Sequence, residues 1–277
     1  MNIDKIIEQA LAEDIGSGDH TSLSCIPENA TGKAKLMVKD SGILAGVSIS
    51  EKIFRKIDAS LCIKILLTDG SIINKGDIAF TVEGKSISIL SAERLVLNFM
   101  QRMSGIATAT HELVQIIKGT KAKILDTRKT TPLLREIEKM AVRIGGGYNH
   151  RMGLYDMIMI KDNHIDFAGG IEKAILSTQQ YLKNKKLNLK IEIEVRNLDD
   201  VKEVMRIGIA NRIMLDNFTP ELMKEAVKII NGKFETEASG GITKENIRAY
   251  AETGVDFISV GVITHHIKSL DLSLKAC

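Results

Sequence analysis

The sequence predicts an α/β protein whose two parts differ in how strands and helices follow one another. Up to about residue 107, short β-like runs alternate with glycine turns. From about Lys121 onward, six short apolar runs alternate with segments of helical spacing. Such alternation is typical of a parallel sheet, and a complete barrel has eight strand–helix units. The second part, residues 108–266, is therefore predicted to be a reduced α/β barrel of parallel strands.

In the first part, residues 3–12 have the apolar spacing of a helix, and residues 13–22, EDIGSGDHTS, have turn and cap chemistry. Residues 69–84 read as hairpins packed on a sheet. Residues 91–110 predict a helix that is apolar on more than one face and is buried between layers. The β-like runs are AKLMVKD (34–40), ILAGV (43–47), CIKILLTDG (62–70) and DIAFTVEG (77–84).

In the second part, helices are expected between the apolar runs, and Thr219 before Pro220 gives one of them a cap with proline in the first turn. The predicted strands are KAKILD (121–126), MIMIK (157–161), LKIEIEV (189–195), RIMLD (212–216), FETEAS (234–239) and DFISV (256–260). The predicted helices are residues 132–142, 171–182, 199–205, 220–230 and 244–253.

Composition excludes several classes of protein. With 277 residues, 44% of them hydrophobic, the chain can bury a sizeable core. A net charge of +3 is small for this length and argues against a nucleic-acid partner. No apolar run approaches the roughly 20 residues that span a bilayer, which argues against a membrane protein. Cys25, Cys62 and Cys277 show no CxxC spacing and no signal peptide precedes them, so reduced thiols in a cytoplasmic protein are expected.

Cations gather where the predicted strands end. Arg128 and Lys129 follow one apolar run, Lys161 ends the next, and His150 and Arg151 follow the glycine run 145–147. Parallel α/β folds build their sites at the carboxyl ends of strands. Arginine offers a planar fork and lysine a movable point charge, so the mixture indicates a small ligand with more than one kind of anionic group.

Carboxylates and glycines occupy other strand ends. Glu192 and Glu194 face the same side of one strand, and Asp216 ends the next, so they could bind Mg²⁺ through water, accept from sugar hydroxyls, or simply be solvated. Glycine-rich loops after the last two strands form a recurring phosphate site in barrels. The residues of those loops are Ser239, Gly240 and Gly241, then Gly261 to Thr264 with His265.

Two other motifs are weaker. The glycine run 145–147 follows a helix and lacks GxGxxG or P-loop spacing, so it is interpreted as a tight turn that lets His150 and Arg151 reach the pocket. The remaining histidines have no spacing that forms a metal set. His111 is expected in a helix, His20 in a turn, His164 close enough to orient Lys161, and His266 at the surface.

Several blocks in one order carry a resemblance that spans nearly the whole chain. They are AERLVLNFMQRMSGIATAT, DTRKT, GGGYNHRMGL, IKDNHI, IEIEVRNL, IMLDNF, ASGGIT and TGVDFISVG. In this order they closely resemble the quinolinate phosphoribosyltransferase family of type II phosphoribosyltransferases, also called nicotinate-nucleotide pyrophosphorylase (carboxylating).

The resemblance implies an N-terminal α/β sandwich, residues 1–107, to which the tail 267–277 returns. It implies the joining of quinolinate and 5-phosphoribosyl-1-pyrophosphate (PRPP) to give nicotinate mononucleotide, pyrophosphate and CO₂, in NAD biosynthesis. It selects Glu194 and Asp216 for ribose and Mg²⁺, with Glu192 less clearly assigned. It also implies a homodimer in which Arg94 enters the pocket of the partner subunit. The residues implied for quinolinate are Arg94, Arg128, Lys129, His150, Arg151 and Lys161, with Lys129 and Lys161 also catalytic.

Three other functions stay open on the residues. A relative with the same fold could use another acceptor, although the full set of cations fits a dicarboxylate better. Lys161 at a strand end could also form a Schiff base, as in barrel lyases. A sugar-phosphate sensor would need the cations but not the carboxylates Glu194 and Asp216. Fold alone does not decide among these functions.

Overall fold

A computed structural model describes residues 2–277, and the chain divides into two compact units. The first unit comprises Met1–Glu112, Lys129–Gly146 and Val262–Cys277. The second unit comprises Leu113–Arg128 and Gly147–Gly261. The mixed α/β class predicted from the sequence is confirmed. The domain boundary near residue 107 stays a prediction.

The first unit contains a four-stranded antiparallel sheet in the order β12-β1-β5-β3. In β1, Leu36 and Val38 are buried while Lys33 is exposed, which is the alternation expected of a sheet with one face on a core. The strand β12 comes from the tail of the chain and pairs with β1. The bounds are β1 Thr31–Val38, β3 Cys62–Ile65, β5 Ile78–Lys85 and β12 Leu272–Ala276.

A second, two-stranded sheet pairs β2 (Gly42–Ile43) with β4 (Ile72–Ile73). The segment 69–84 turns as predicted, but β4 and β5 join different sheets and do not form a hairpin. The turn between them is closed by the carboxylate of Asp77, which accepts from the backbone N–H of Asn74. Because β4 is only two residues long, it finds its partner in β2 rather than in the next strand.

The helices of the first unit are longer or more numerous than predicted. The helix α4 continues beyond both ends of the predicted range, because it buries side chains on more than one face, among them Leu95, Val96 and Met100. The helix α3 was not predicted; it begins after Gly46, whose positive φ of 95° ends the extended segment. The bounds are α1 Ile3–Ile15, α2 His20–Cys25, α3 Val47–Ile57, α4 Ser86–Ile116, α5 Arg135–Ile144 and α11 Val262–His265.

The second unit contains a six-stranded parallel sheet in the order β6-β11-β10-β9-β8-β7. All six predicted strands are confirmed, and every residue of β8 is buried, as expected for a strand covered on both faces. The bounds are β6 Lys123–Leu125, β7 Ile158–Ile160, β8 Ile191–Val195, β9 Arg212–Asp216, β10 Glu235–Ser239 and β11 Phe257–Ser259.

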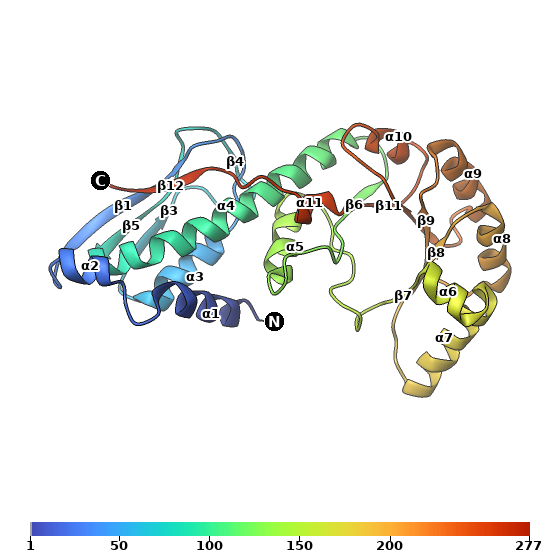
Figure 1. Ribbon diagram of the computed structural model, residues 1–277. Coiled ribbons are helices and arrows are strands. Elements are labelled where there is room, and N and C mark those ends of the chain that lie inside the picture. The colour runs from blue at the N-terminus through green and yellow to red at the C-terminus, as the bar shows by residue number, and fades with distance from the viewer. Residues whose placement is uncertain (1) are drawn as a thin grey trace. The chain divides into compact units, whose positions relative to one another are not determined.

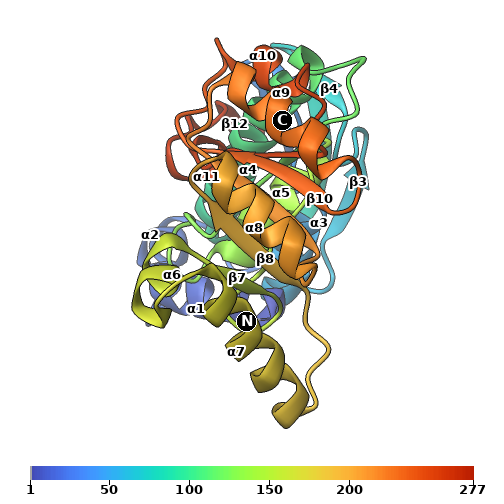
Figure 2. The ribbon, with the colours of Figure 1, turned by 90° about the vertical axis from the view of Figure 1, so that its right-hand side faces the viewer.

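Helices α8 and α9 pack along one another on the outer side of this sheet (Figures 1 and 2). Thr219 caps α9 as predicted, because its hydroxyl accepts from the backbone N–H of Leu222 and Pro220 follows it. The short helix α6, directly after β7, was not predicted. The bounds are α6 Asp162–Ala168, α7 Ile171–Lys185, α8 Leu198–Ile207, α9 Pro220–Ile230 and α10 Ile247–Ala251. Within residues 2–277, none of the helices combines the length and apolar character needed to cross a bilayer.

Candidate active site

The carboxyl ends of the parallel strands bring predicted site residues to one edge of the second unit. Glu194 lies near the end of β8, Asp216 ends β9 and Ser239 ends β10. These strands are neighbours, and Asp216 and Ser239 are in register. Lys161 follows β7, the next strand along the sheet. The predicted strand-end cations and carboxylates therefore belong to consecutive positions of one sheet edge.

A cation and two carboxylates interact at this edge. Lys161 Nζ lies 3.7 Å from Glu194 Oε2. Burial raises the pKa of Glu194 above its usual range; the negative charges of Asp216 and Asp162 add to this, while Lys161 opposes it. Glu194 and Asp216 lie on the neighbouring strands β8 and β9, near their carboxyl ends. The ring of His164 accepts the backbone N–H of Lys161 at 2.9 Å, so it orients the main chain that carries this lysine.

Two arginines of the second unit also act on each other. Arg128 is exposed and Arg151 is partly buried. Burial lowers the pKa of Arg151, and the positive charge of Arg128 lowers it further. The Arg151 guanidinium donates to the main-chain oxygen of Met157 at 3.2 Å. Because like charges repel, an anion bound between these arginines would be stabilised by both.

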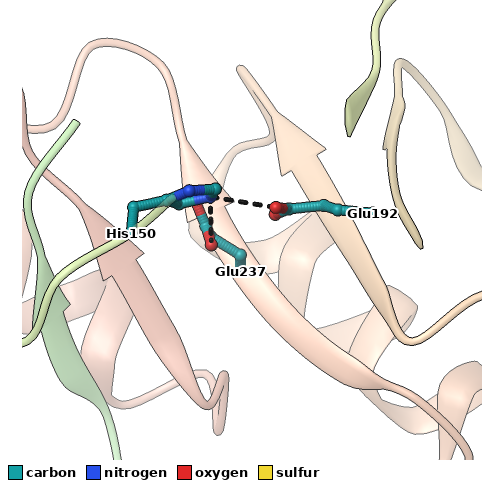
Figure 3. A group of neighbouring side chains, drawn as sticks. All are labelled: His150, Glu192 and Glu237. Carbon is teal, nitrogen blue, oxygen red and sulfur yellow. Dashed lines mark ion pairs between the residues drawn. The ribbon is translucent and has the colours of Figure 1, made fainter. Parts of the chain in front are cut away.

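His150 lies below this edge, inside the unit (Figure 3). Its side chain is only 5% exposed, and Nε2 lies 2.9 Å from Glu192 Oε2 and 3.5 Å from Glu237 Oε2. Its other ring nitrogen, Nδ1, accepts the backbone N–H of Arg151 at 2.7 Å. These ring contacts are all to the protein, so the predicted binding of quinolinate by His150 stays a prediction.

Arg212 completes the buried cluster. Its guanidinium reaches Glu237 Oε2 at 2.7 Å and Glu235 Oε2 at 3.1 Å, and it stacks over the ring of Phe257 at 4.1 Å. Burial would raise the pKa of Glu237, but His150 and Arg212 lower it overall.

The pKa values of His150 and Glu192 are shifted by burial and by the charged groups around them. Burial lowers the pKa of His150, but the contacts with Glu192 and Glu237 outweigh it and raise the pKa. Burial and the charge of Glu237 also raise the pKa of Glu192. Both shifts favour an additional proton within the His150–Glu192 pair. Because Nδ1 accepts the backbone N–H of Arg151, the ring is neutral and this proton lies on Glu192.

Sequence reasoning missed Arg212 and Glu237 and left Glu192 with the ribose or the metal. The structure places Glu192 against His150, fully buried. A signal was present: charged residues alternate with apolar ones in IEIEV and FETEAS, and RIMLD begins with an arginine. On neighbouring buried strands, such charges must pair with one another.

The predicted phosphate loop after β10 has the backbone that it needs. Gly240 has a φ of +89°, and a Cβ there would collide with the side chain of Asn217. Gly241 has a φ of +60°. Asn217 donates its side-chain N–H to Asp216 at 2.6 Å and its main-chain N–H to Ser239 at 2.9 Å. Asn217, which sequence reasoning missed, therefore links the carboxylate of β9 to the glycine loop of β10.

Three predicted site residues belong to the first unit. Arg94 is exposed on α4, and His265 is exposed in α11. The main-chain oxygen of Lys129 accepts the hydroxyl of Thr264 at 2.8 Å, which ties the segment of Lys129 to that of His265. Arg102 holds both segments, since it donates to Thr131 and to the main-chain oxygen of Thr264.

The fold and the strand-end groups define a barrel-type α/β enzyme that binds a small polyanion. Two family profiles match the chain and identify its family within this class of enzymes. The profile described as "Quinolinate phosphoribosyl transferase, N-terminal domain" matches residues 19–104, and that described as "Quinolinate phosphoribosyl transferase, C-terminal domain" matches residues 106–275. The chain belongs to the quinolinate phosphoribosyltransferase family.

Individual relatives are similar over nearly the whole chain. A quinolinate phosphoribosyltransferase (decarboxylating) 2, mitochondrial, of Nicotiana glauca is 46% identical, with 99% of this chain and 82% of the relative covered. The chloroplastic nicotinate-nucleotide pyrophosphorylase (carboxylating) of Arabidopsis thaliana is 47% identical, with 98% and 81% covered. The solved structure of nicotinate-nucleotide pyrophosphorylase from Francisella tularensis matches with a TM-score of 0.90 and 41% identity, covering 99% of this chain and 96% of that one.

Proposed function

We propose that this protein transfers the phosphoribosyl group of PRPP to quinolinate and releases pyrophosphate and CO₂, giving nicotinate mononucleotide. The observation that carries the proposal is the strand-end edge of the second unit. There, Lys161 pairs with Glu194, and Asp216 ends the next strand. Arg128 and Arg151 of the same unit, which repel each other, follow β6 and the glycine run. The names of the full-length relatives support the same activity.

Quinolinate carries two adjacent carboxylates that repel each other. Arg128, Arg151 and Lys161 supply positive charge for them, and arginine can bind a carboxylate through two parallel hydrogen bonds. We propose that Lys129 contacts the substrate or the pyrophosphate, and that His150 contributes at the same pocket.

Glu194 and Asp216 face the other substrate. As pyrophosphate leaves C1′, the ribose gains oxocarbenium character, and two carboxylates stabilise that positive charge. Ser239 to Gly241, together with Gly261 and His265, would hold the 5′-phosphate through backbone N–H groups and a ring nitrogen. The backbone geometry at Gly240 and Gly241 fits this role, since both have positive φ.

The same carboxylates are suited to Mg²⁺. Glu194 and Asp216 offer carboxylate oxygens, the ligands that Mg²⁺ prefers, on neighbouring strands. Bound to pyrophosphate, Mg²⁺ would neutralise charge that grows on the leaving group.

Transfer should precede loss of CO₂. The pyridine nitrogen becomes positively charged once it is joined to C1′, and it lies beside the carbon that carries the 2-carboxylate. When that carboxylate departs as CO₂, the electron pair left on the ring carbon is stabilised by the adjacent positive nitrogen. The protein therefore needs no prosthetic group for this step.

We further propose a homodimer with shared sites and a cytoplasmic location. An exposed Arg94 on α4 is available to a second copy. All three cysteines are exposed free thiols, a state that reducing compartments preserve. The two plant relatives are named mitochondrial and chloroplastic, so the location needs its own measurement by cell fractionation.

The direct test supplies purified protein with quinolinate, PRPP and Mg²⁺. Formation of nicotinate mononucleotide and equal release of CO₂ support the proposal, and absence of both from well-folded protein would overturn it. The Schiff-base alternative predicts instead that Lys161 condenses with a carbonyl substrate to an imine with loss of water, and that borohydride reduces this imine to a secondary amine that keeps the substrate attached to Lys161. Lys161→Met is the control for that reaction.

A further inference from the structure

The buried cluster below the strand ends draws on three adjacent strands. Glu192 comes from β8, Arg212 from β9 and Glu237 from β10. Figure 3 shows the ring of His150 pointing toward Glu192 and Glu237. Glu192 and Glu237 are fully buried, and the Arg212 side chain is 12% exposed. None of the three is at the strand-end edge where the substrates are proposed to bind.

The carboxylates fix which ring nitrogen of His150 carries hydrogen. Nδ1 accepts the backbone N–H of Arg151, so Nδ1 carries no hydrogen and the hydrogen of the neutral ring lies on Nε2. Nε2 lies 2.9 Å from Glu192 and 3.5 Å from Glu237, so the nearby carboxylates favour this tautomer. The backbone N–H of His150 is held as well, by Asp126 Oδ1 at 2.8 Å. Two consecutive peptide groups are thus fixed at the point where Arg151 leaves the chain.

Arg212 maintains this arrangement from the far side. It holds Glu237 through a charge-assisted contact of 2.7 Å, so that this carboxylate stays turned toward His150. Without a fixed carboxylate, the hydrogen could move to Nδ1. A protonated Nδ1 cannot accept from the Arg151 N–H, and the two donors would repel.

We propose that Glu237 and Arg212 are positioning residues for quinolinate binding, which act through the His150 ring on the main chain of Arg151. The inference rests on the proposed function, since it assigns Arg151 to quinolinate. It predicts that a residue which never touches the substrate affects the affinity for quinolinate but not for PRPP.

A metal ion is the competing occupant of the same cluster. Within residues 2–277, His150, Glu192 and Glu237 form the one group of three such side chains with ligand atoms within 4.8 Å of one another. However, Arg212 already neutralises Glu237. A metal ion on Nε2 would also place the ring hydrogen on Nδ1, which instead accepts the backbone N–H of Arg151. These observations favour a proton over a metal ion.

The chain offers a matched pair of variants for the test. Glu235 and Glu237 lie on the same strand and both bind Arg212, but of the two only Glu237 contacts His150. Glu237→Gln should raise the Kd and KM for quinolinate by about 10- to 100-fold, the usual effect of removing a second-layer partner, with the KM for PRPP within about twofold. Glu235→Gln should leave both substrates within about twofold of the wild type.

The ring tautomer provides a second measurement that needs no activity. In ¹⁵N NMR spectra of the wild type at neutral pH, His150 should show a protonated Nε2 and an unprotonated Nδ1. Glu235→Gln should keep this pattern, and Glu237→Gln should lose it. If Glu237→Gln does not fold, the wild-type spectrum and Arg212→Lys take its place, with Arg212→Lys expected to weaken quinolinate binding selectively.

Several outcomes would overturn the inference. In the binding measurements, these outcomes are an unchanged quinolinate Kd in folded Glu237→Gln, equal losses of affinity for both substrates, or equal losses of affinity in both glutamine variants. In the NMR spectra, the outcome is a wild-type ring with Nδ1 protonated. In metal analysis, it is stoichiometric metal at the cluster in the purified protein. An inactive wild type that shows the expected tautomer would instead count against the proposed function, so the two failures are distinguishable.

Discussion

The interior of the second unit and its strand-end edge differ in the exposure of their charged side chains. In the interior, Arg212, Glu237, Glu192 and His150 are buried and face one another. At the edge, Arg128 is exposed, Arg151 is repelled by it, and the Lys161 side chain is 48% exposed. Buried charge is stable only when it is paired within the protein. Charged side chains that stay exposed, such as Arg128 and Lys161, can be reached by a ligand.

The largest effect that distinguishes the two regions should come from the carboxylates of the edge. Asp216→Asn and Glu194→Gln should lower kcat by several hundredfold, since one group that stabilises transition-state charge is commonly worth about 10²–10³. The Kd for quinolinate, measured by calorimetry, should change by less than about threefold, because these groups face sugar and metal. Asp199→Asn, at an exposed position in α8, is the control. A large loss of quinolinate affinity with normal turnover would show that Glu194 and Asp216 contact quinolinate and not the sugar and the metal.

The next largest effect should appear when the substrate carries one carboxylate instead of two. Nicotinate lacks the 2-carboxylate of quinolinate and leaves part of the cluster of Arg128, Arg151 and Lys161 unpaired. A stranded charge costs several kcal/mol, so kcat/KM for nicotinate should be at least about a hundredfold lower. Competition kinetics with both acids would measure the ratio, and similar values for the two acids would show that the edge does not recognise a dicarboxylate.

A smaller effect, about fourfold, tests whether the edge is completed by a second copy. Arg94→Ala and Lys161→Ala should each be inactive. After subunit exchange about half of the dimers are mixed, and each mixed dimer has one pocket with both lesions and one intact pocket, given the reciprocal contacts of a twofold interface. Activity should therefore recover to about a quarter of the wild-type value. If exchange is demonstrated and activity does not recover, Arg94 does not serve a neighbouring pocket.

The smallest expected effect is on the free energy of unfolding, and it concerns Glu235, a half-exposed partner of Arg212. Glu235 binds Arg212 at 3.1 Å, but its side chain is 40% exposed. Glu235→Gln should lower the free energy of unfolding by less than about 1 kcal/mol because solvent screens the pair. Glu237→Gln removes the buried carboxylate that Arg212 and His150 share, leaves Glu192 as the remaining buried one, and should cost about 3 kcal/mol. Urea denaturation of both variants gives the comparison, and equal losses would contradict it.

Strand ends were predictable from the sequence because the cues are local. An apolar run followed by a charged residue identifies Arg128, Lys161 and Asp216 without knowledge of strand order. The interior cluster was not predictable in this way. Glu192 and Glu237 become partners only through β9, which lies between their strands and brings Arg212. Strand order is a property of the whole sheet, so the sequence alone left Glu192 with the wrong neighbours.

The first unit shows the same limit in its secondary structure. Long helices with strong periodicity, such as α4, were found, although their ends were not. The helix α3 was missed because its start depends on Gly46, which packs closely against Met100 of α4. The pairing of β4 with β2 likewise depends on a segment 30 residues away in the chain. Local patterns identify elements, whereas distant contacts decide where they end and which neighbour they choose.

The first unit is assembled from three separate stretches of chain, and this has a consequence for its synthesis. On the ribosome, β1 emerges early, but its neighbour β12 emerges only after the whole second unit has been made. Until then one edge of β1 has free N–H and C=O groups that another nascent chain could pair with. Lys33 and Lys35 alternate along this strand, and lysine at an edge discourages such pairing. Positive charges on β1 would therefore disfavour pairing with another chain during the interval before its final strand has been synthesised.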